Sequence, residues 1–282
     1  MLAIPWVVRT PLAARAEISR ANGRAAMFRT SFVAAAAISS LLLVATGMSV
    51  ANAAEIKLLC AVALQPAIAG LIPEFEKSSG HKVTITYGTA GAMADRVQKG
   101  EAADVTIVSG PQIDELQGQG KVVAGSRVDI AKVGVGVFVR KGAAKPDISS
   151  ADAFKRSMLA ARSIAYPDPA GGGASGIYVA SLLDRLGIAG EMKAKTKFYP
   201  PSAPLYESVA SGEVEIGFNQ ISEILAQPSV EFLGPLPAAI QNFTQFAAGI
   251  IASSTQADAG KALIGFLSSP TAAAFMKSKG FE

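Results

Sequence analysis

The stretch Tyr87-Gly88-Thr89-Ala90-Gly91-Ala92-Met93 joins a short apolar strand to a helix. It has a counterpart in Asp168-Pro169-Ala170-Gly171-Gly172-Gly173-Ala174-Ser175-Gly176-Ile177-Tyr178. A junction of this kind directs several backbone N–H groups, and the positive end of a helix dipole, toward one point. Such a point suits an anion. Two such junctions in distant parts of one chain therefore indicate a protein that holds a small anion.

The first 53 residues read as a secretory signal peptide. An apolar run from Phe32 to Ala45 precedes Ala51-Asn52-Ala53, the small-x-small pattern that a signal peptidase cleaves. The run is too short for a membrane span, which needs about 20 apolar residues. Met27 offers an alternative start of the same signal. We expect a mature chain that begins at Ala54 and is soluble in the periplasm.

The net charge of the chain comes from this leader. The whole sequence has 26 basic and 22 acidic residues, and the leader holds five arginines and one glutamate. Subtracting them leaves 21 basic and 21 acidic residues in 54–282, a formal net charge of zero. Electrostatic attraction to nucleic acid is therefore not expected.

The composition also argues against an enzyme. The chain has one histidine and one cysteine, so the usual nucleophile–base arrangements are nearly excluded, although paired carboxylates remain open. The single cysteine, Cys60, lies in an apolar strand and is expected to be a small buried core residue. No Walker lysine or metal-ligand cluster is present. We expect no catalytic residue, no metal and no cofactor.

Apolar periodicity alternates between strand and helix along the mature chain, which predicts an α/β fold with parallel sheets and helices on both faces. On such sheets ligands bind beyond the carboxyl ends of the strands. Strands are expected at 58–63, 82–87, 104–109, 133–140, 163–166, 197–199, 214–218 and 246–252, and helices at 66–79, 92–99, 113–117, 151–161, 175–186, 205–211, 258–267 and 271–279.

A series of short motifs, in order along the whole mature chain, resembles the periplasmic molybdate-binding proteins of ABC importers. Each motif is weak alone, and their order is specific for the family. They are Ile56 to Leu64, Phe75 to Gly80, Val83 to Tyr87, Gly100 to Val105, Asp168-Pro169, Gly176-Ile177-Tyr178, Leu186-Gly187, Val209 to Glu213, Gly217, and Phe266 to Ala273 with Gly280-Phe281.

The resemblance implies a type II two-lobe periplasmic-binding-protein fold. Each lobe is then a mostly parallel sheet flanked by helices, and two crossing segments near 133–137 and 246–250 form a hinge. Lobe I would combine 54–134 with 248–282, and lobe II would be 135–247. The resemblance also implies a monomer that binds a small anion in the inter-lobe cleft and delivers it to an ABC permease in the inner membrane.

Departures from the family pattern leave the ligand open. Where the family places two serines that donate to an oxyanion, this chain has Ala63 and Ala90, and Gln220 replaces an expected tyrosine. Two lost donors would each weaken oxyanion binding by about 1.5–3 kcal/mol. The leading ligand is a molybdate- or tungstate-type oxyanion, and the alternative is a small organic carboxylate. The expected ligand-binding residues are Ala63, Leu64, Thr89, Ala90, Gly91, Gly172, Gly173, Ala174, Ser175, Ser202, Tyr206, Asn219 and Gln220.

Plainer interpretations of these residues also remain open. The glycines of 88–91 and 171–173 would equally suit a tight turn and a flexible loop without a ligand. Asn219 and Gln220 could open a helix capped by Ser222 instead of facing a cleft. A sensor that binds without transporting is a further alternative, and a transcriptional regulator of the same fold would need a DNA-binding segment where this chain has its export signal.

Overall fold

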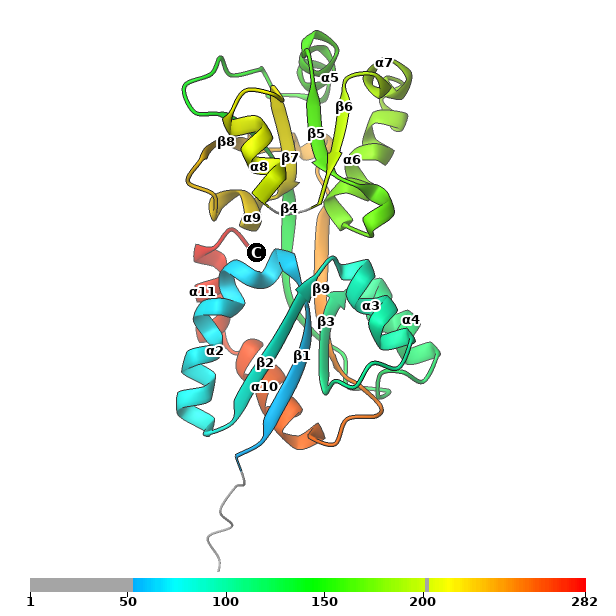
Figure 1. Ribbon diagram of the computed structural model, residues 1–282, viewed down its shortest axis with the longest axis vertical. Coiled ribbons are helices and arrows are strands. Elements are labelled where there is room, and N and C mark those ends of the chain that lie inside the picture. The colour runs from blue at the N-terminus through cyan, green and yellow to red at the C-terminus, as the bar shows by residue number, and fades with distance from the viewer. Residues whose placement is uncertain (1–52, 201–202) are drawn as a thin grey trace, which may run out of the picture. The chain divides into compact units, whose positions relative to one another are not determined.

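The computed structural model describes residues 53–200 and 203–282, and the expected signal peptide, 1–53, lies almost wholly outside them (Figure 1). The described residues form two lobes, and their strands belong to one continuous nine-stranded sheet. Eight strands follow the order β2-β1-β3-β9-β4-β7-β5-β6, and the ninth, β8, pairs with β4. The predicted α/β two-lobe fold is confirmed.

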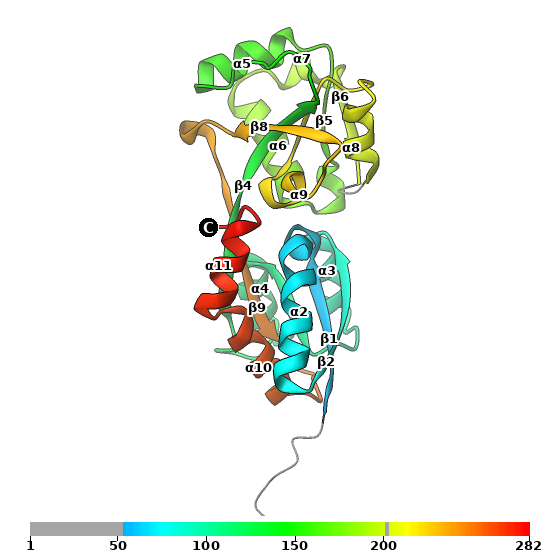
Figure 2. The same ribbon diagram turned by 90° about the vertical axis from the view of Figure 1, so that its left-hand side faces the viewer.

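Lobe I contains a sheet with helices on both faces (Figures 1 and 2). Helices α2, α10 and α11 lie on one side of this sheet, and α3 and α4 lie on the other. Its elements are β1 Glu55–Ala61, η2 Val62–Leu64, α2 Gln65–Ser79, β2 Lys82–Gly88, α3 Ala90–Gln98, β3 Val105–Ser109, α4 Gly110–Gly118, β9 Phe243–Ile250, α10 Ala257–Leu267 and α11 Pro270–Ser278.

Lobe II is built in the same way around its own sheet (Figure 1). Three of its helices and strands, α7, α9 and β8, were not among the expected elements, because all are short and β8 ends in Gly-Pro, although a helix after Asn219-Gln220 was left open as an alternative. Its elements are β4 Val128–Arg140, α5 Ala151–Ala160, β5 Ile164–Pro167, η3 Pro169–Gly171, α6 Ala174–Arg185, α7 Ala189–Lys193, β6 Thr196–Tyr199, α8 Ala203–Ala210, β7 Ile216–Gln220, α9 Ile221–Leu225, β8 Val230–Pro235 and η4 Ala238–Ile240.

Strands β4 and β9 connect the lobes, where the two crossing segments were expected. They pair antiparallel from Val128↔Ala248 to Gly134↔Phe243, so the sheet pairing is mixed and not parallel throughout. Beyond this ladder, the Gln241 side chain accepts from the Val135 N–H and donates to its carbonyl, each at 2.9 Å. A side-chain amide thus continues the pairing of the two crossing segments by one residue.

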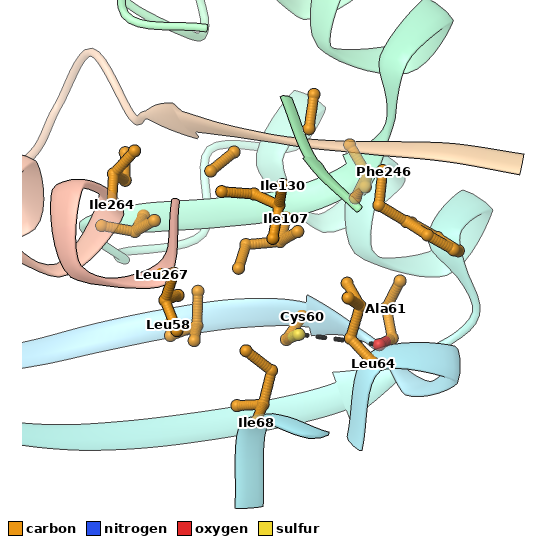
Figure 3. Close-up of a cluster of buried hydrophobic side chains, with 14 of the residues drawn as sticks. Leu58, Cys60, Ala61, Leu64, Ile68, Ile107, Ile130, Phe246, Ile264 and Leu267 are labelled. Atoms are coloured by element: carbon orange, nitrogen blue, oxygen red, sulfur yellow. Dashed lines mark hydrogen bonds between the residues drawn. The ribbon is translucent and has the colours of Figure 1, made fainter. Parts of the chain in front are cut away.

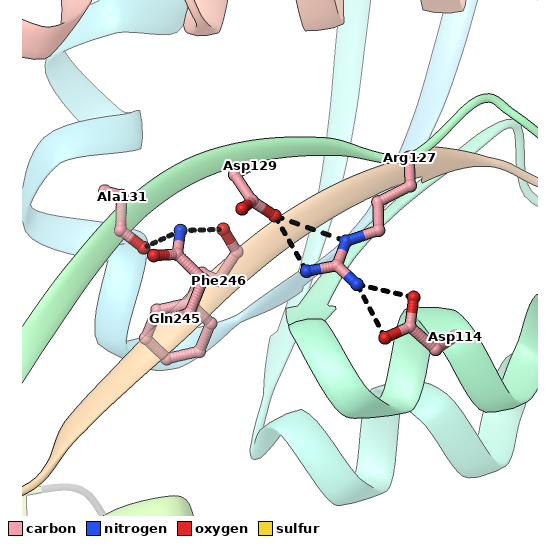
Figure 4. A network of polar contacts seen from close by, with 6 residues as sticks. All are labelled: Asp114, Arg127, Asp129, Ala131, Gln245 and Phe246. Atoms are coloured by element: carbon pink, nitrogen blue, oxygen red, sulfur yellow. Dashed lines mark hydrogen bonds and ion pairs between the residues drawn. The ribbon is translucent and has the colours of Figure 1, made fainter.

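Polar side chains fix the lobe I end of these strands (Figure 4). The Arg127 guanidinium bonds to the carboxylates of Asp114 on α4 and Asp129 on β4. The Gln245 amide on β9 donates to the carbonyls of Ala131 and Phe246, each at 3.2 Å. These bonds lie beside the register shift that interrupts the ladder between Asp129 and Ala131.

Each lobe has its own apolar core. The lobe I core includes side chains from 56–133 and 246–281, with Cys60 fully buried among Leu58, Ile68 and Ile107 (Figure 3). Two further clusters cover the two faces of the lobe II sheet and use residues 135–236. The separate cores agree with the lobe boundaries proposed from the sequence, with one difference. Phe246 and Ala247, which were expected in lobe II, pack in the lobe I core.

Candidate functional site

The first contribution to the site comes from the turn after β1. The strand expected through Ala63 ends at Ala61, because the chain must reverse before α2 and does so in the 3-10 turn η2. Ala63 lies at the surface of this turn that faces lobe II. Leu64, expected to bind ligand, is instead fully buried in the lobe I core, so only its backbone is near the site.

The second contribution is the N-terminus of α3. The helix starts at Ala90, two residues earlier than predicted, because the Thr89 hydroxyl accepts from the Ala92 N–H at 3.1 Å and caps it. The same hydroxyl donates to the carbonyl of Gly171 in lobe II. The N–H of Gly91 donates to the Gly172 carbonyl at 3.2 Å. The N–H of Ala90 donates to no residue that the structure describes, so it can serve a ligand.

The third contribution is the glycine-rich turn before α6. The Asp168 carboxylate caps η3 by accepting from the Ala170 N–H at 2.9 Å, and Gly172 follows in the left-handed region with φ +71°. A Cβ at Gly176 would lie 1.9 Å from the carbonyl oxygen of Pro167, so only glycine allows α6 to start this close to β5. Gly171 and Gly172 therefore serve the contact between the lobes, and Gly176 serves the placement of α6.

A polar network lies behind this turn. Asn219 is fully buried, accepts from the Ser175 hydroxyl at 2.8 Å and donates to the Tyr206 hydroxyl at 2.8 Å. Strand β7 was expected to end at Phe218, but it runs on to Gln220 because Asn219 and Gln220 pair with β4. Asn219 therefore connects α6, β7 and α8 and positions Ser175, but it does not line the cleft.

Gln220 is the last residue of β7 and faces the cleft, 2% exposed. Its Nε2 donates to the Thr244 hydroxyl at 3.0 Å, and its Oε1 has no partner among the described residues. Because a hydroxyl can donate as well as accept, rotation of the amide by half a turn keeps the bond to Thr244. That rotation would present the NH₂ group to an anion.

The two lobes enclose a small central cavity of about 20 Å³. It brings together seven of the expected site residues and four others, Ala61, Val62, Glu223 and Phe246. The expected residues that line it are Ala63, Thr89, Ala90, Gly173, Ala174, Ser175 and Gln220.

Two larger cavities adjoin the central cavity. One, of about 440 Å³, includes Gln65, Tyr206 and Glu223, and we call it the Tyr206 cavity. The other, of about 320 Å³, includes Ala90, Gly172 and Ala174. Tyr206 and Gly172 are thus beside the centre, Gly91 is at the contact between the lobes, and Ser202 lies outside the described residues.

Glu223 is the site residue that the sequence analysis missed. It lies in the first turn of α9 and lines both the central cavity and the Tyr206 cavity. Burial raises the pKa of this carboxyl to about 8, and interaction with the Asn219 side chain opposes the shift. A carboxylate one helical turn after the polar pair Asn219-Gln220 was the available signal. Ser222, considered as a cap, instead donates to the Ala63 carbonyl across the cleft at 2.8 Å.

Within 53–200 and 203–282, no group of three or more His, Cys, Asp or Glu side chains is placed to hold a metal ion. In the same residues, every helix is too short or too polar to cross a membrane. The described residues of the site supply backbone N–H groups, aliphatic side chains, the Phe246 ring, amides, hydroxyls and one carboxyl.

Two lobes, a paired hinge and a cleft between helix N-termini define a solute-binding protein. The chain belongs to the family described as bacterial extracellular solute-binding protein, whose model matches residues 56–282. This confirms the resemblance found in the sequence.

The names of two relatives indicate different functions, and one solved structure shares its name with the second relative. The chain is 32% identical to an aconitate isomerase of Pseudomonas sp., over 87% of this chain and 95% of that one. It is 28% identical to the molybdate-binding protein ModA of Azotobacter vinelandii, over 82% of this chain and 91% of that one. The periplasmic molybdate-binding protein of Azotobacter vinelandii superposes with a TM-score of 0.68 at 21% identity, covering 80% and 98% of the two chains.

The comparisons agree with the expected family and binding role, but they do not settle whether the chain is an enzyme. The family and its binding role agree with the sequence analysis. The expectation that the chain is no enzyme stays a prediction, because one relative bears the name of an enzyme.

Proposed function

We propose that this chain is an exported solute-binding protein that holds a small organic polycarboxylate of the aconitate type between its lobes. The observation that carries the proposal is the pair of methyl side chains, Ala63 and Ala90, at the central cavity. They offer a ligand apolar contact and no hydroxyl donors. A carbon skeleton is stabilised by such contact, whereas an oxyanion gains no hydrogen bond from these two methyl groups and would depend on other donors.

The backbone supplies the groups that would bind the carboxylates. The N–H groups of Ala90, Ala174 and Ser175 have no acceptor among the described residues and lie at the N-termini of α3 and α6. Helix N-termini stabilise anions through these groups and through the helix dipole. Two such termini from opposite lobes suit a ligand with more than one carboxylate.

The dimensions of the site also favour an organic ligand. A cavity of about 20 Å³ holds roughly one water molecule. The Tyr206 cavity next to it has about 440 Å³ and shares Val62 and Glu223 with it. A tricarboxylate would place one end at the helix N-termini and extend toward Tyr206. We propose that the closed, ligand-bound monomer then delivers its ligand to an ABC permease in the inner membrane.

A tetrahedral oxyanion such as molybdate or tungstate is the second candidate. The helix N-termini support it, because an oxyanion held by backbone N–H groups needs no side chain. The relative named as a molybdate-binding protein supports it as well.

A ligand screen distinguishes the two candidates. We expect cis- or trans-aconitate to raise the unfolding temperature, since a ligand at 100 times its Kd stabilises a protein by about 2.7 kcal/mol. Molybdate, tungstate and sulfate serve as the comparison set, and calorimetry then gives each Kd. Stabilisation by molybdate, with no response to any carboxylate at millimolar concentration, would overturn the proposal in favour of the oxyanion.

A further inference from the structure

Glu223 is buried with no cationic partner among the described residues, and the Asn219 side chain is the polar group that acts on its carboxyl. Its side chain lies between the central cavity and the Tyr206 cavity and is only 8% exposed. No cationic side chain acts on this carboxyl. Burying a carboxyl without a cation is unfavourable, and an amide or apolar side chain would be tolerated better in a purely structural role. A buried carboxyl that lines a cleft and has no cation beside it is a candidate functional group.

Glu223 is the only carboxyl among the described residues that line the central cavity and the Tyr206 cavity. Among the described residues, the other ionisable side chain at either cavity is Tyr206 of α8, whose pKa is raised by burial and by the nearby Glu223. None of the charged residues of α2, α8, β4 and β8 lines these cavities. The neighbours that do, Val62, Gln65 and Gln220, are uncharged.

We propose that Glu223 carries a proton between two carbons of the bound polycarboxylate, so that the cleft isomerises its ligand as well as binding it. This inference rests on the proposed function. In an aconitate, a methylene carbon and a vinyl carbon are the two ends of one three-carbon unit. Because Glu223 lines the cavity that holds the ligand, its carboxyl can reach either end with a small displacement.

The step balances without a co-reactant. The Glu223 carboxylate removes a proton from the methylene carbon, and the electron pair of that C–H bond spreads over the three carbons and the carboxylates at both ends. Glu223 then returns the proton to the former vinyl carbon, and the double bond forms on the other side. Backbone N–H groups of Ala90, Ala174 and Ser175 would stabilise the charge that develops on the carboxylates.

Deuterium exchange tests this transfer directly. Protein is mixed with trans-aconitate in D₂O, and proton NMR follows loss of the methylene and vinyl signals and appearance of the cis isomer. We expect wild type to catalyse both, and Glu223→Gln to lose at least ~100-fold in rate, the usual contribution of a general base. The Gln variant should still bind trans-aconitate in calorimetry, because it resembles the protonated Glu223. The exchange rate of wild type should rise with pH and level off once the carboxyl is ionised.

Glu207→Gln is the matched control, because Glu207 is exposed on α8 next to Tyr206, and its exchange rate should equal that of wild type. Binding of trans-aconitate without exchange would overturn the proton transfer and leave the proposed function intact. Exchange by Glu223→Gln at the wild-type rate would also overturn it, since the base would then be another group. No binding of either aconitate isomer would overturn both the proposed function and this inference.

Discussion

The backbone N–H of Gly91 donates to the carbonyl oxygen of Gly172 at 3.2 Å and so joins the N-terminus of α3 to the glycine turn of the other lobe. A Cβ on Gly91 would lie 2.9 Å from the Gly172 Cα, and a Cβ on Gly172 would lie 3.0 Å from the Gly91 Cα. The two lobes meet here through bare backbone. Contact this close is open to glycine alone.

The first prediction concerns this contact. Gly91→Ala should hold the lobes apart and weaken binding of aconitate by about 10-fold, because overpacking of this size destabilises a contact by about 1–3 kcal/mol. Calorimetry measures the affinity, and small-angle scattering shows whether saturating ligand still compacts the protein. Gly190→Ala is the control, since Gly190 is exposed in α7 with open space around it. Equal affinities for both variants would show that closure does not use this contact.

The second prediction concerns the methyl groups of the central cavity. In the double variant Ala63→Ser and Ala90→Ser, two hydroxyls occupy space that we assign to the carbon skeleton, so aconitate should bind about 10-fold more weakly. Molybdate should bind at least ~10-fold more tightly, because a hydrogen bond to an ionised acceptor contributes about 1.5–3 kcal/mol. Ala92→Ser, exposed on the same turn of α3, should change neither affinity. Tighter binding of aconitate by the double variant would contradict the proposed pose.

The third prediction concerns the approach of α6 to β5. Gly176→Ala places a methyl group 1.9 Å from the Pro167 carbonyl oxygen, so the free energy of unfolding should fall by about 3 kcal/mol. Urea denaturation measures it. Gly265→Ala, in the last turn of α10 with no atom outside its own helix backbone and chain neighbours within 4 Å of the new Cβ, should instead stabilise by about 0.5–1 kcal/mol. A loss below about 0.5 kcal/mol for Gly176→Ala would mean that α6 shifts freely.

The fourth prediction concerns the dependence of stability on pH. Burial raises the Glu223 pKa to about 8, so between the ordinary value and pH 8 the unfolded chain releases a proton that the folded protein keeps. Stability from this group is complete below the unfolded pKa and is lost as pH rises toward 8. The free energy of unfolding of Glu223→Gln, relative to that of wild type, should therefore rise by up to about 1.4 kcal/mol per pH unit in that window. Above the window the difference should stay constant. A pH-independent difference between the two proteins would mean that Glu223 is ionised in the fold.

The fifth prediction concerns the single thiol. Cys60 is fully buried, its Sγ lies 3.6 Å from the Ala61 carbonyl oxygen, and burial raises its pKa strongly. Thiolate is the reactive form, so Ellman's reagent should not react with the native protein at pH 8. The reaction should become complete in urea, with a midpoint equal to that of unfolding. Stoichiometric reaction within seconds under native conditions would show that this core opens.

Much of the fold follows from local sequence signals. Gly80 and Gly187 end helices in the left-handed region, with φ of 75° and 68°, as their positions after apolar periodic runs predict. The predicted ends of some strands and helices differ from the observed ends by a few residues. These ends are determined by capping or strand pairing, which the apolar periodicity does not show. Thr89 caps α3 early, and pairing with β4 extends β7 through Gln220.

The site was predicted less completely, for physical reasons. Leu64 and Ala63 are neighbours in sequence, yet the 3-10 turn places one side chain in the core and the other at the cleft. The contact between Gly91 and Gly172 joins two lobes whose residues are far apart in the sequence. A local sequence pattern therefore cannot predict it. The burial of Glu223 could not be predicted from the sequence, because it comes from α2 and η2 of lobe I and from Tyr206 on α8.

The pairing of β4 with β9 determines how the lobes can move. The ladder ends at Gly134↔Phe243, and the Gln241 amide then holds Val135 by two bonds, so neither crossing segment can bend without the other. We therefore expect opening to be a twist of this pair of strands. The last residue, Glu282, exchanges two backbone hydrogen bonds with Lys132 on β4. We expect such a twist to move the C-terminal residue as well, so ligand binding in the cleft should alter a part of the surface that the ligand does not touch.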